Sequence, residues 1–251
     1  MPDLPELAAE PAKTSTLRIG HKGADAIVRG NSLESFDTAL ECGVDLIEFD
    51  VLSTQRDGTG ALMLAHDFNA ITAPGTVPLA DGLAHLAGER FSGVRFNVDL
   101  KLRGFERQVV ELLREYDLES RSLISTMEVE SLPLIRQASS SAKLGLSVPK
   151  VKRNWAEHWA TRPVAVGTLM VLRRRVPKLI ARAIRAGGID ACMSHQSLVT
   201  PYFVEQVHDA GGELYVWTVD HAADIARFAA MGVNGIASND PRLFSVLDES
   251  A

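Results

Sequence analysis

Glu48 and Asp50 stand two residues apart inside an apolar run, DLIEFDV, where charged side chains are unusual. Strand side chains alternate between two faces, so both carboxylates would point the same way. Asp99 and Lys101 repeat this spacing in the later run RFNVDLK. A carboxylate among apolar residues is costly unless it is paired, hydrogen-bonded or bound to a metal ion. Taken singly, each carboxylate could be a helix cap, but together the four residues predict a site.

Histidines occupy similar places in the chain. His21 ends the apolar run LRIGH, His66 follows the run that holds the first two carboxylates, and His195 and Trp217 close later runs. Two histidines in one site can act as general base and general acid, although His195 alone would more often be a hydrogen-bonded structural residue. Carboxylates without cysteine favour Mg²⁺ or Ca²⁺ over Zn²⁺, and lysine beside a metal suits phosphate. This set predicts metal-assisted cleavage of a phosphodiester.

Short apolar runs alternate with amphipathic stretches from residue 17 onward. The predicted strands cover residues 17–21, 46–51, 95–101, 122–126, 143–148, 190–195, 213–219 and 234–238. Eight strands with intervening helices predict an α/β fold, a (β/α)₈ TIM barrel in a single domain. A doubly wound open sheet is the alternative, but neither G-x-G-x-x-G nor a P-loop motif is present to support a nucleotide-binding form. In a barrel, the candidate residues above would meet at the carboxyl ends of the strands.

Residues typical of helix starts and ends support this alternation of strands and helices. Asn31 and Glu34 have the spacing of a capping box, and Gly43 predicts the end of that helix. Thr200 is the predicted N-cap of a later helix. Helical spacing also covers residues 104–116, 128–138, 167–186 and 221–232. The segment 61–67, ALMLAHD, predicts a short extra strand outside the barrel.

Composition excludes some classes of protein. The chain has 251 residues, 46% of them hydrophobic, with a formal net charge of −6, which argues against a nucleic-acid partner. Cys42 and Cys192 are far apart, so we expect no disulfide and a cytoplasmic location. The start of the chain has no signal-peptide pattern, and no apolar run approaches the ~20 residues that span a bilayer. We expect residues 1–16 to be a flexible lead-in and 17–251 to form the domain.

Several short motifs, in order, resemble those of glycerophosphodiester phosphodiesterases. That family has His-Arg-Gly, Glu-Asn-Thr, Glu-x-Asp, His-Asp, Glu-x-Lys, Trp-Thr and Gly-Ile-x-Thr-Asp-x-Pro. This chain has HKG (21–23), GNS (30–32), EFD (48–50), HD (66–67), DLK (99–101), WTVD (217–220) and GIASNDP (235–241). The resemblance spans about residues 18–245. Any one motif is weak evidence, whereas the ordered set is specific.

The resemblance implies a TIM barrel that hydrolyses glycerophosphodiesters to glycerol 3-phosphate and an alcohol. It implies one divalent cation, Mg²⁺ or Ca²⁺ with Mn²⁺ as a further candidate, and a small-molecule substrate. The implied site residues are Glu48, Asp50 and Asp99 for the metal, His21, His66 and Lys101 for catalysis, and Lys22, Asn31, His195 and Trp217 for the substrate. Which histidine is the base is left open.

Some positions depart from the family pattern. Lys22 replaces arginine, with Arg29 nearby as a candidate substitute, and Gly30 replaces glutamate. Asp99 replaces glutamate, and the related sphingomyelinases D use Asp-x-Lys at this position. Asn239 replaces an acidic residue near the C-terminus, as does Asn234. Two alternatives therefore stay open: a phospholipase-D-like enzyme that converts lysophospholipids to a cyclic phosphate, and a non-catalytic phosphate-binding barrel.

The segment 150–185 is strongly basic, with ten Lys/Arg and one acidic residue, Glu157. Trp155 and Trp159 lie one helical turn apart in the same segment. Such a segment could make weak contact with an anionic membrane. An ordinary outer barrel helix with a solvated basic face is the preferred alternative, because VPKLIARAIRAG carries the apolar stripe of such a helix.

Overall fold

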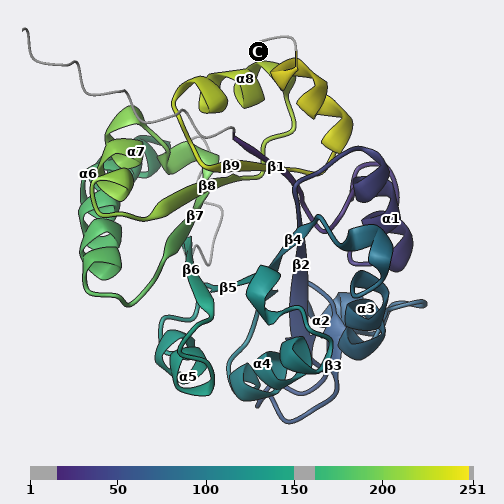
Figure 1. Ribbon diagram of the computed structural model, residues 1–251. Coiled ribbons are helices and arrows are strands. Elements are labelled where there is room, and N and C mark those ends of the chain that lie inside the picture. Colours follow the sequence, from purple (N-terminus) through teal and green to yellow (C-terminus); the bar gives the residue numbers. More distant parts are fainter. Residues whose placement is uncertain (1–15, 150–161, 249–251) are drawn as a thin grey trace, which may run out of the picture.

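Eight parallel strands close into a barrel that is ringed by helices (Figure 1). The computed structural model describes residues 16–149 and 162–248. The strand order runs β1-β9-β8-β7-β6-β5-β4-β2, and β1 also pairs with β2, which closes the barrel. The predicted single-domain (β/α)₈ barrel is therefore confirmed. The expected lead-in (apart from residue 16), Glu157 and the tryptophan pair lie outside the described residues.

The predicted strands agree with the observed ones to within two residues at each end. The barrel strands are β1 (Leu17–Gly20), β2 (Leu46–Ser53), β4 (Arg95–Leu100), β5 (Ser122–Thr126), β6 (Lys143–Val148), β7 (Ala191–His195), β8 (Glu213–Trp217) and β9 (Gly235–Ser238). The helices are α1 (Leu33–Glu41), α2 (Phe68–Ile71), α3 (Leu79–Leu86), α4 (Glu106–Glu115), α5 (Ser131–Ala138), α6 (Arg162–Arg185), α7 (Pro201–His208) and α8 (Ala222–Ala230). The extra strand also exists: β3 (Leu62–Leu64) pairs antiparallel with the end of β2, outside the barrel.

Alternation along the strands divides the core in two. On β2, Ile47, Phe49 and Val51 are buried in the larger core, between the strands and the surrounding helices. Leu46 belongs instead to a smaller cluster that fills the barrel interior. Glu48 and Asp50 share the inward face with Leu46, because side chains two residues apart point the same way.

The predicted capping box of the first helix is wrong. The N-cap of α1 is Ser32, whose hydroxyl accepts a hydrogen bond from the Ser35 amide at 3.2 Å. Asn31 has a left-handed backbone (φ 55°), so it precedes the cap and directs its side chain elsewhere. The later prediction is confirmed, since Thr200 caps α7 by accepting from the Phe203 amide.

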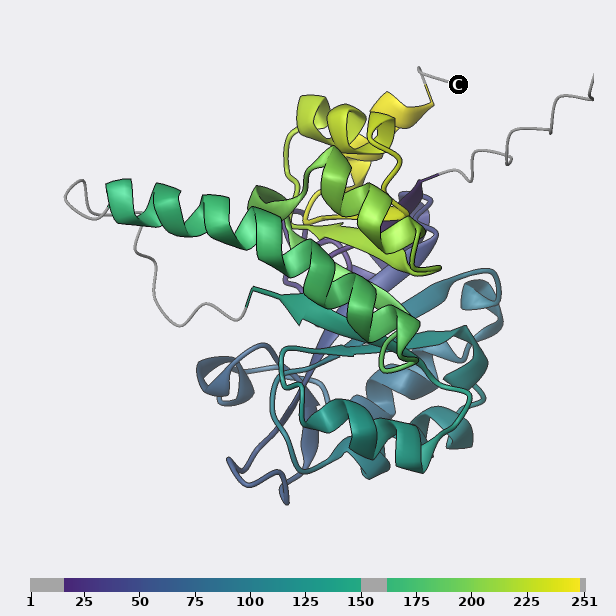
Figure 2. The same cartoon turned by 90° about the vertical axis from the view of Figure 1, so that its left-hand side faces the viewer.

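Helix α6 is much longer than its neighbours and extends past the carboxyl ends of the strands (Figure 2). Its C-terminal half packs on the barrel through Ile180 and Ile184. Within the described residues, no helix combines the length and apolar character needed to cross a bilayer. Both cysteines are free, as predicted.

Candidate active site

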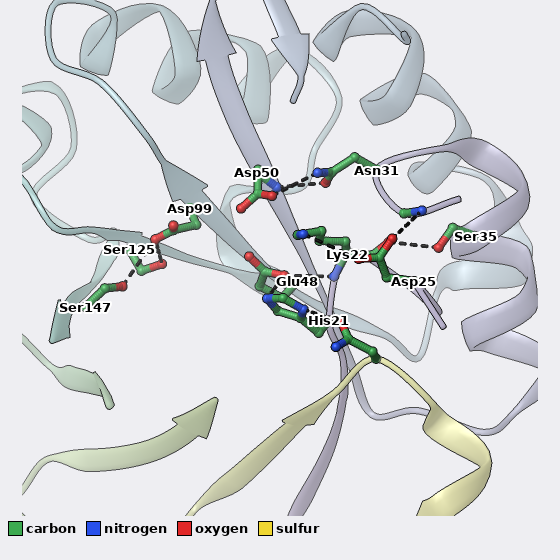
Figure 3. Close-up of polar contacts among 12 residues, drawn as sticks. His21, Lys22, Asp25, Asn31, Ser35, Glu48, Asp50, Asp99, Ser125 and Ser147 are labelled. Carbon is green, nitrogen blue, oxygen red and sulfur yellow. Dashed lines mark hydrogen bonds and ion pairs between the residues drawn. The ribbon is translucent and has the colours of Figure 1, made fainter. Parts of the chain in front are cut away.

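Glu48, Asp50 and Asp99 converge at the carboxyl end of the barrel. Asp50 and Asp99 are direct neighbours in the parallel register of β2 and β4, and Glu48 lies one inward position below Asp50. All three are buried, and one carboxylate oxygen from each lies within 4.8 Å of the others. Figure 3 shows these carboxylates with His21 beside Glu48. The shorter Asp99 therefore reaches the cluster.

Each carboxylate is held by neutral donors. Asp50 Oδ2 accepts from Asn31 Nδ2 at 2.9 Å, while the Asp50 amide donates to Asn31 Oδ1 at 3.0 Å. Glu48 Oε2 accepts from the backbone amide of Lys22 at 2.8 Å. Lys22 and Asn31 both have a positive φ, 51° and 55°, which is uncommon for residues other than glycine. Backbone strain therefore occurs at the two residues that orient Glu48 and Asp50.

Two serines hold Asp99 from the next two strands of the barrel, β5 and β6. Ser125 Oγ on β5 donates to Asp99 Oδ1 at 2.6 Å, and Ser147 Oγ on β6 donates to the same oxygen at 3.2 Å. Sequence reasoning missed both serines. The signal was present, since each occupies an inward position of a predicted strand, two residues beyond an inward-facing neighbour. These hydroxyls leave Asp99 Oδ2 for a charged partner.

Lys101 is that partner. Its Nζ forms an ion pair with Asp99 and lies 2.6 Å from Asp50 Oδ1. Burial acts to lower the pKa of Lys101, but Asp99, Asp50 and Glu48 outweigh it and raise that pKa above its usual range. Burial likewise opposes ionisation of Asp50, yet Lys101, with smaller effects of His66 and His21, holds the pKa of Asp50 below its usual range. The lysine is charged and Asp50 is ionised.

Glu48 is the carboxylate whose charge is not offset. Burial and then the negative charge of Asp50 raise the pKa of Glu48 well above its usual range, although Lys101 opposes this. One ammonium thus faces three buried carboxylates. Clustered carboxylate oxygens are the ligands that hard divalent cations prefer. The residues present fit a divalent cation, which would remove the repulsion between Glu48 and Asp50.

His21 belongs to a hydrogen-bonded chain that ends at Asp220. The Asp220 carboxylate accepts from the Asn239 backbone amide and from Asn239 Nδ2, both at 2.8 Å. The side-chain amide of Asn239 cannot be flipped by 180°, because its oxygen would then face the Asp220 carboxylate. Asn239 Oδ1 therefore lies 2.6 Å from His21 Nδ1 and accepts a hydrogen bond from the Nδ1–H group. Neutral His21 consequently has an unprotonated Nε2, which lies 3.9 Å from Glu48 Oε2.

His66 lies at the rim of the site, at the carboxyl end of the barrel. Its side chain is 55% exposed, and its Nδ1 is 3.9 Å from Asp67 Oδ2. Asp67 itself caps α2 through hydrogen bonds to the amides of Asn69 and Ala70. His21, in contrast, is largely buried, and burial lowers its pKa although Asp50 opposes this. We call the opening at the carboxyl ends of the barrel strands the mouth. His21 lies in a buried part of the mouth, and His66 lies in a solvent-exposed part of it.

His195 and Trp217 form the opposite wall. They are paired in the register of β7 and β8, and their rings meet edge to face with centroids 5.2 Å apart. The Ser197 amide donates to His195 Nδ1 at 3.2 Å. Neutral His195 therefore carries its proton on Nε2, the opposite tautomer to His21. The sequence had left His195 as an ambiguous residue, and the structure places it in the mouth.

Two of the unusual positions have structural explanations. The ammonium of Lys22 lies 3.4 Å from Asp25 Oδ2, and the Gly30 amide donates to Asp25 Oδ1 at 2.8 Å. A Cβ at residue 30 would lie 2.4 Å from that oxygen, so glutamate cannot replace Gly30 unless Asp25 moves. Arg29 contacts Pro74 and Thr76 in the loop that follows α2, where it holds that loop.

Comparison with known proteins identifies the family of this chain. The sequence profile of the glycerophosphoryl diester phosphodiesterase family matches residues 21–76 and 94–243. A glycerophosphodiester phosphodiesterase of Caldanaerobacter subterraneus is 26% identical over an alignment of 260 positions. The alignment covers 90% of this chain and 95% of that protein.

Solved structures share the fold. A glycerophosphodiester phosphodiesterase of Parabacteroides distasonis superposes with a TM-score of 0.70 at 17% identity, covering 96% of this chain and 100% of that one. A phosphodiesterase of Oleispira antarctica, solved with the product sn-glycerol-3-phosphate, gives a TM-score of 0.65 at 18% identity over 93% and 97% of the two chains. The chain therefore belongs to the glycerophosphoryl diester phosphodiesterase family and is a phosphoric diester hydrolase.

Proposed function

We propose that this protein hydrolyses glycerophosphodiesters to glycerol 3-phosphate and an alcohol, in a reaction that depends on a divalent cation. The observation that carries the proposal is the buried cluster of Glu48, Asp50, Asp99 and Lys101 beside the unprotonated Nε2 of His21. Family membership and the product bound to the Oleispira antarctica relative support this choice of substrate.

Glu48, Asp50 and Asp99 would hold the cation, with Mg²⁺ or Ca²⁺ favoured by the all-oxygen ligands and Mn²⁺ as a further candidate. When bound, the cation supplies positive charge to the phosphoryl oxygens as negative charge develops there. Lys101 is already ion-paired with Asp50 and Asp99, so its ammonium is fixed at the edge of the cluster. It adds a second fixed positive charge at low reorganisation cost.

We assign general base and general acid from the geometry of the histidines. His21 Nε2 takes the proton of the attacking water, and the new O–P bond forms. Where the vicinal hydroxyl of the glycerol attacks instead, its O–P bond closes a cyclic phosphate, which water opens to glycerol 3-phosphate in a second step with the roles of the two histidines exchanged. The P–O bond to the alcohol breaks on the far side of phosphorus, and its oxygen takes a proton from His66. The exposed position of His66 suits a leaving group that departs to solvent. Hydrogen bonding of His21 Nδ1 to Asn239 keeps Nε2 free for this step.

Three of the remaining residues, His195, Trp217 and Lys22, bind the substrate in this proposal. His195 presents an Nε2–H donor, and Trp217 an apolar surface, on the wall opposite the carboxylates. Lys22 supplies charge near the phosphate as a point cation rather than a planar fork. Asn31 acts through Asp50, because both ends of its amide already bind that residue.

Product analysis tests the proposal. Glycerophosphocholine is incubated with the chain after removal of metal, with and without Mg²⁺, Ca²⁺ or Mn²⁺, and products are followed by phosphorus NMR. We expect glycerol 3-phosphate only with cation, and losses of at least about 100-fold in kcat for His21→Ala and His66→Ala. His85→Ala, in a histidine bound to Asp37 outside the mouth, is the matched control. Accumulation of a cyclic phosphate from a lysophospholipid would favour the phospholipase-D-like alternative, and no turnover with any cation would favour the non-catalytic one.

A further inference from the structure

Helix α6 carries a charged surface that the proposed reaction does not use. Its sequence contains no acidic residue. Five cationic side chains on it are exposed: Arg174, Arg175, Lys178, Arg182 and Arg185. Within the part of the chain that the structure describes, no carboxylate forms an ion pair with any of these five cations. The rest of the protein is acidic enough to leave the whole chain at −6, so this charge is concentrated.

Apolar side chains interrupt the same face. Met170, Val171 and Leu179 are 60%, 49% and 64% exposed, and they make up half of the six large hydrophobic residues found exposed in the described chain. Residues spaced three and four apart lie along one line of a helix, so Val171 is continued by Arg174 and Lys178. An ordinary barrel helix would expose polar side chains at these positions. The face is therefore amphipathic in its own right.

The inner face of α6 is already occupied. Ile180 and Ile184 are buried in the core, and Leu172 and Val176 pack against it from partly buried positions. Arg173 turns aside and donates from Nε to the Ser197 carbonyl at 2.8 Å. The exposed face thus cannot be reached by the barrel itself. Figure 2 shows that α6 lies along the outside of the barrel and continues beyond the strand ends.

We propose that the exposed face of α6 docks on the surface of an anionic phospholipid bilayer. Several unpaired cations attract the negative lipid headgroups, and the interleaved Met170, Val171 and Leu179 enter the boundary between headgroups and acyl chains. This pairing of charge with apolar area distinguishes a lipid surface from nucleic acid, whose backbone offers no apolar layer. The mouth lies at the strand ends rather than on the outer side of α6, so docking leaves it open to solvent.

Vesicle sedimentation with the full chain tests the proposal. Wild type is expected to bind vesicles of phosphatidylcholine with phosphatidylserine at low salt, and not vesicles of phosphatidylcholine alone. The triple variant Arg174→Glu, Lys178→Glu, Arg182→Glu should weaken binding by at least about tenfold. The matched control reverses Arg90, Arg107 and Arg227 to Glu. These exposed arginines lie on other faces and give the same change in net charge, so binding should be much less affected.

A second variant isolates the apolar part. Val171→Ser with Leu179→Ser should keep binding at low salt but lose the fraction that survives high salt, because only charge attraction is screened. Activity on glycerophosphocholine should be unchanged in every α6 variant, which separates this surface from the proposed reaction. Equal loss of binding in both triple variants, or no binding by wild type, overturns the proposal. So does α6-dependent self-association or DNA binding without vesicle binding.

Discussion

His21 Nδ1 and Asn239 Oδ1 lie 2.6 Å apart, and this contact determines which nitrogen of His21 is free. The two residues are 218 positions apart in the chain and meet only because β1 and β9 are neighbours in the closed barrel. Asp220 fixes the orientation of the Asn239 amide, so a third residue sets the tautomer of the histidine indirectly. A neutral amide, rather than a carboxylate, faces Nδ1 of the imidazole.

Exchanging the two partners should change the pH dependence. The double variant Asp220→Asn, Asn239→Asp keeps a hydrogen-bonded chain but places a carboxylate on His21. The carboxylate stabilises the imidazolium and raises the pKa of His21. Because a base must be neutral, the acid limb of the kcat/KM profile should move to higher pH by about one unit or more.

Asn234→Asp is the control for this exchange. Asn234 accepts from the Leu214 amide at the other end of the barrel, so the profile of this variant should match wild type. An unshifted acid limb in the exchanged variant would show that His21 does not act as the base.

Ser125→Ala should weaken metal binding without removing a ligand. Its hydroxyl orients Asp99 at 2.6 Å, and loss of such a support typically lowers metal affinity by about 10–100-fold. Titration of the metal-free chain with Mn²⁺, followed by EPR, measures the change. Ser194→Ala is the control, since Ser194 is equally buried but donates to a backbone carbonyl. Equal Mn²⁺ affinity in Ser125→Ala and wild type would contradict the role of Asp99 as a ligand.

Lys101→Met should destabilise the fold strongly. The substitution leaves Asp50 and Asp99 buried without their counter-ion, which costs about 3 kcal/mol or more in the free energy of unfolding. Lys143→Met is the comparison, because Lys143 is 58% exposed and its pair with Glu213 contributes less than about 1 kcal/mol. Urea unfolding of the metal-free proteins gives both values, and similar losses would mean that the buried ion pairs contribute little.

Glu48 should make the metal-free protein less stable as pH rises. Its folded-state pKa is raised above the unfolded value of about 4.3, so the stability it contributes is complete below that pH and is lost through the folded pKa. Asp50 acts oppositely, but only on acidification below about pH 4, because its pKa is depressed. Above about pH 5 Asp50 no longer contributes to the pH dependence, whereas burial lowers the pKa of His21 and of His195, so these two histidines add stability as pH rises and oppose the effect of Glu48.

Glu48→Gln should remove the loss of stability with rising pH that is due to Glu48, measured in the presence of chelator as the difference from wild type. Saturating divalent cation should stabilise wild type, by about 2.7 kcal/mol at 100 times Kd, and stabilise the Gln variant less. The same pH dependence in Glu48→Gln and in wild type would assign the effect to another group.

The sequence by itself determined the barrel and most of the mouth. Regular alternation of apolar runs and amphipathic stretches specified the strands, and the period of two placed Glu48 with Asp50 on one inward face. Local sequence signals were less reliable where one residue type suits two roles. The sequence predicts Asn31 as a helix cap, but its side chain binds Asp50, and the cap is Ser32.

Only the tertiary structure decided which distant residues meet and in what protonation state. The strand register brings Ser125 level with Asp99 and places Ser147 one inward position beyond Gly145, the partner of Ser125, and this register depends on the closed barrel. The tautomer of His21 depends on Asn239 and Asp220 across the β1–β9 junction, and no local pattern encodes a contact over that distance. Sequence thus specified the chemistry that each strand carries, whereas closure of the barrel decided how those groups are paired.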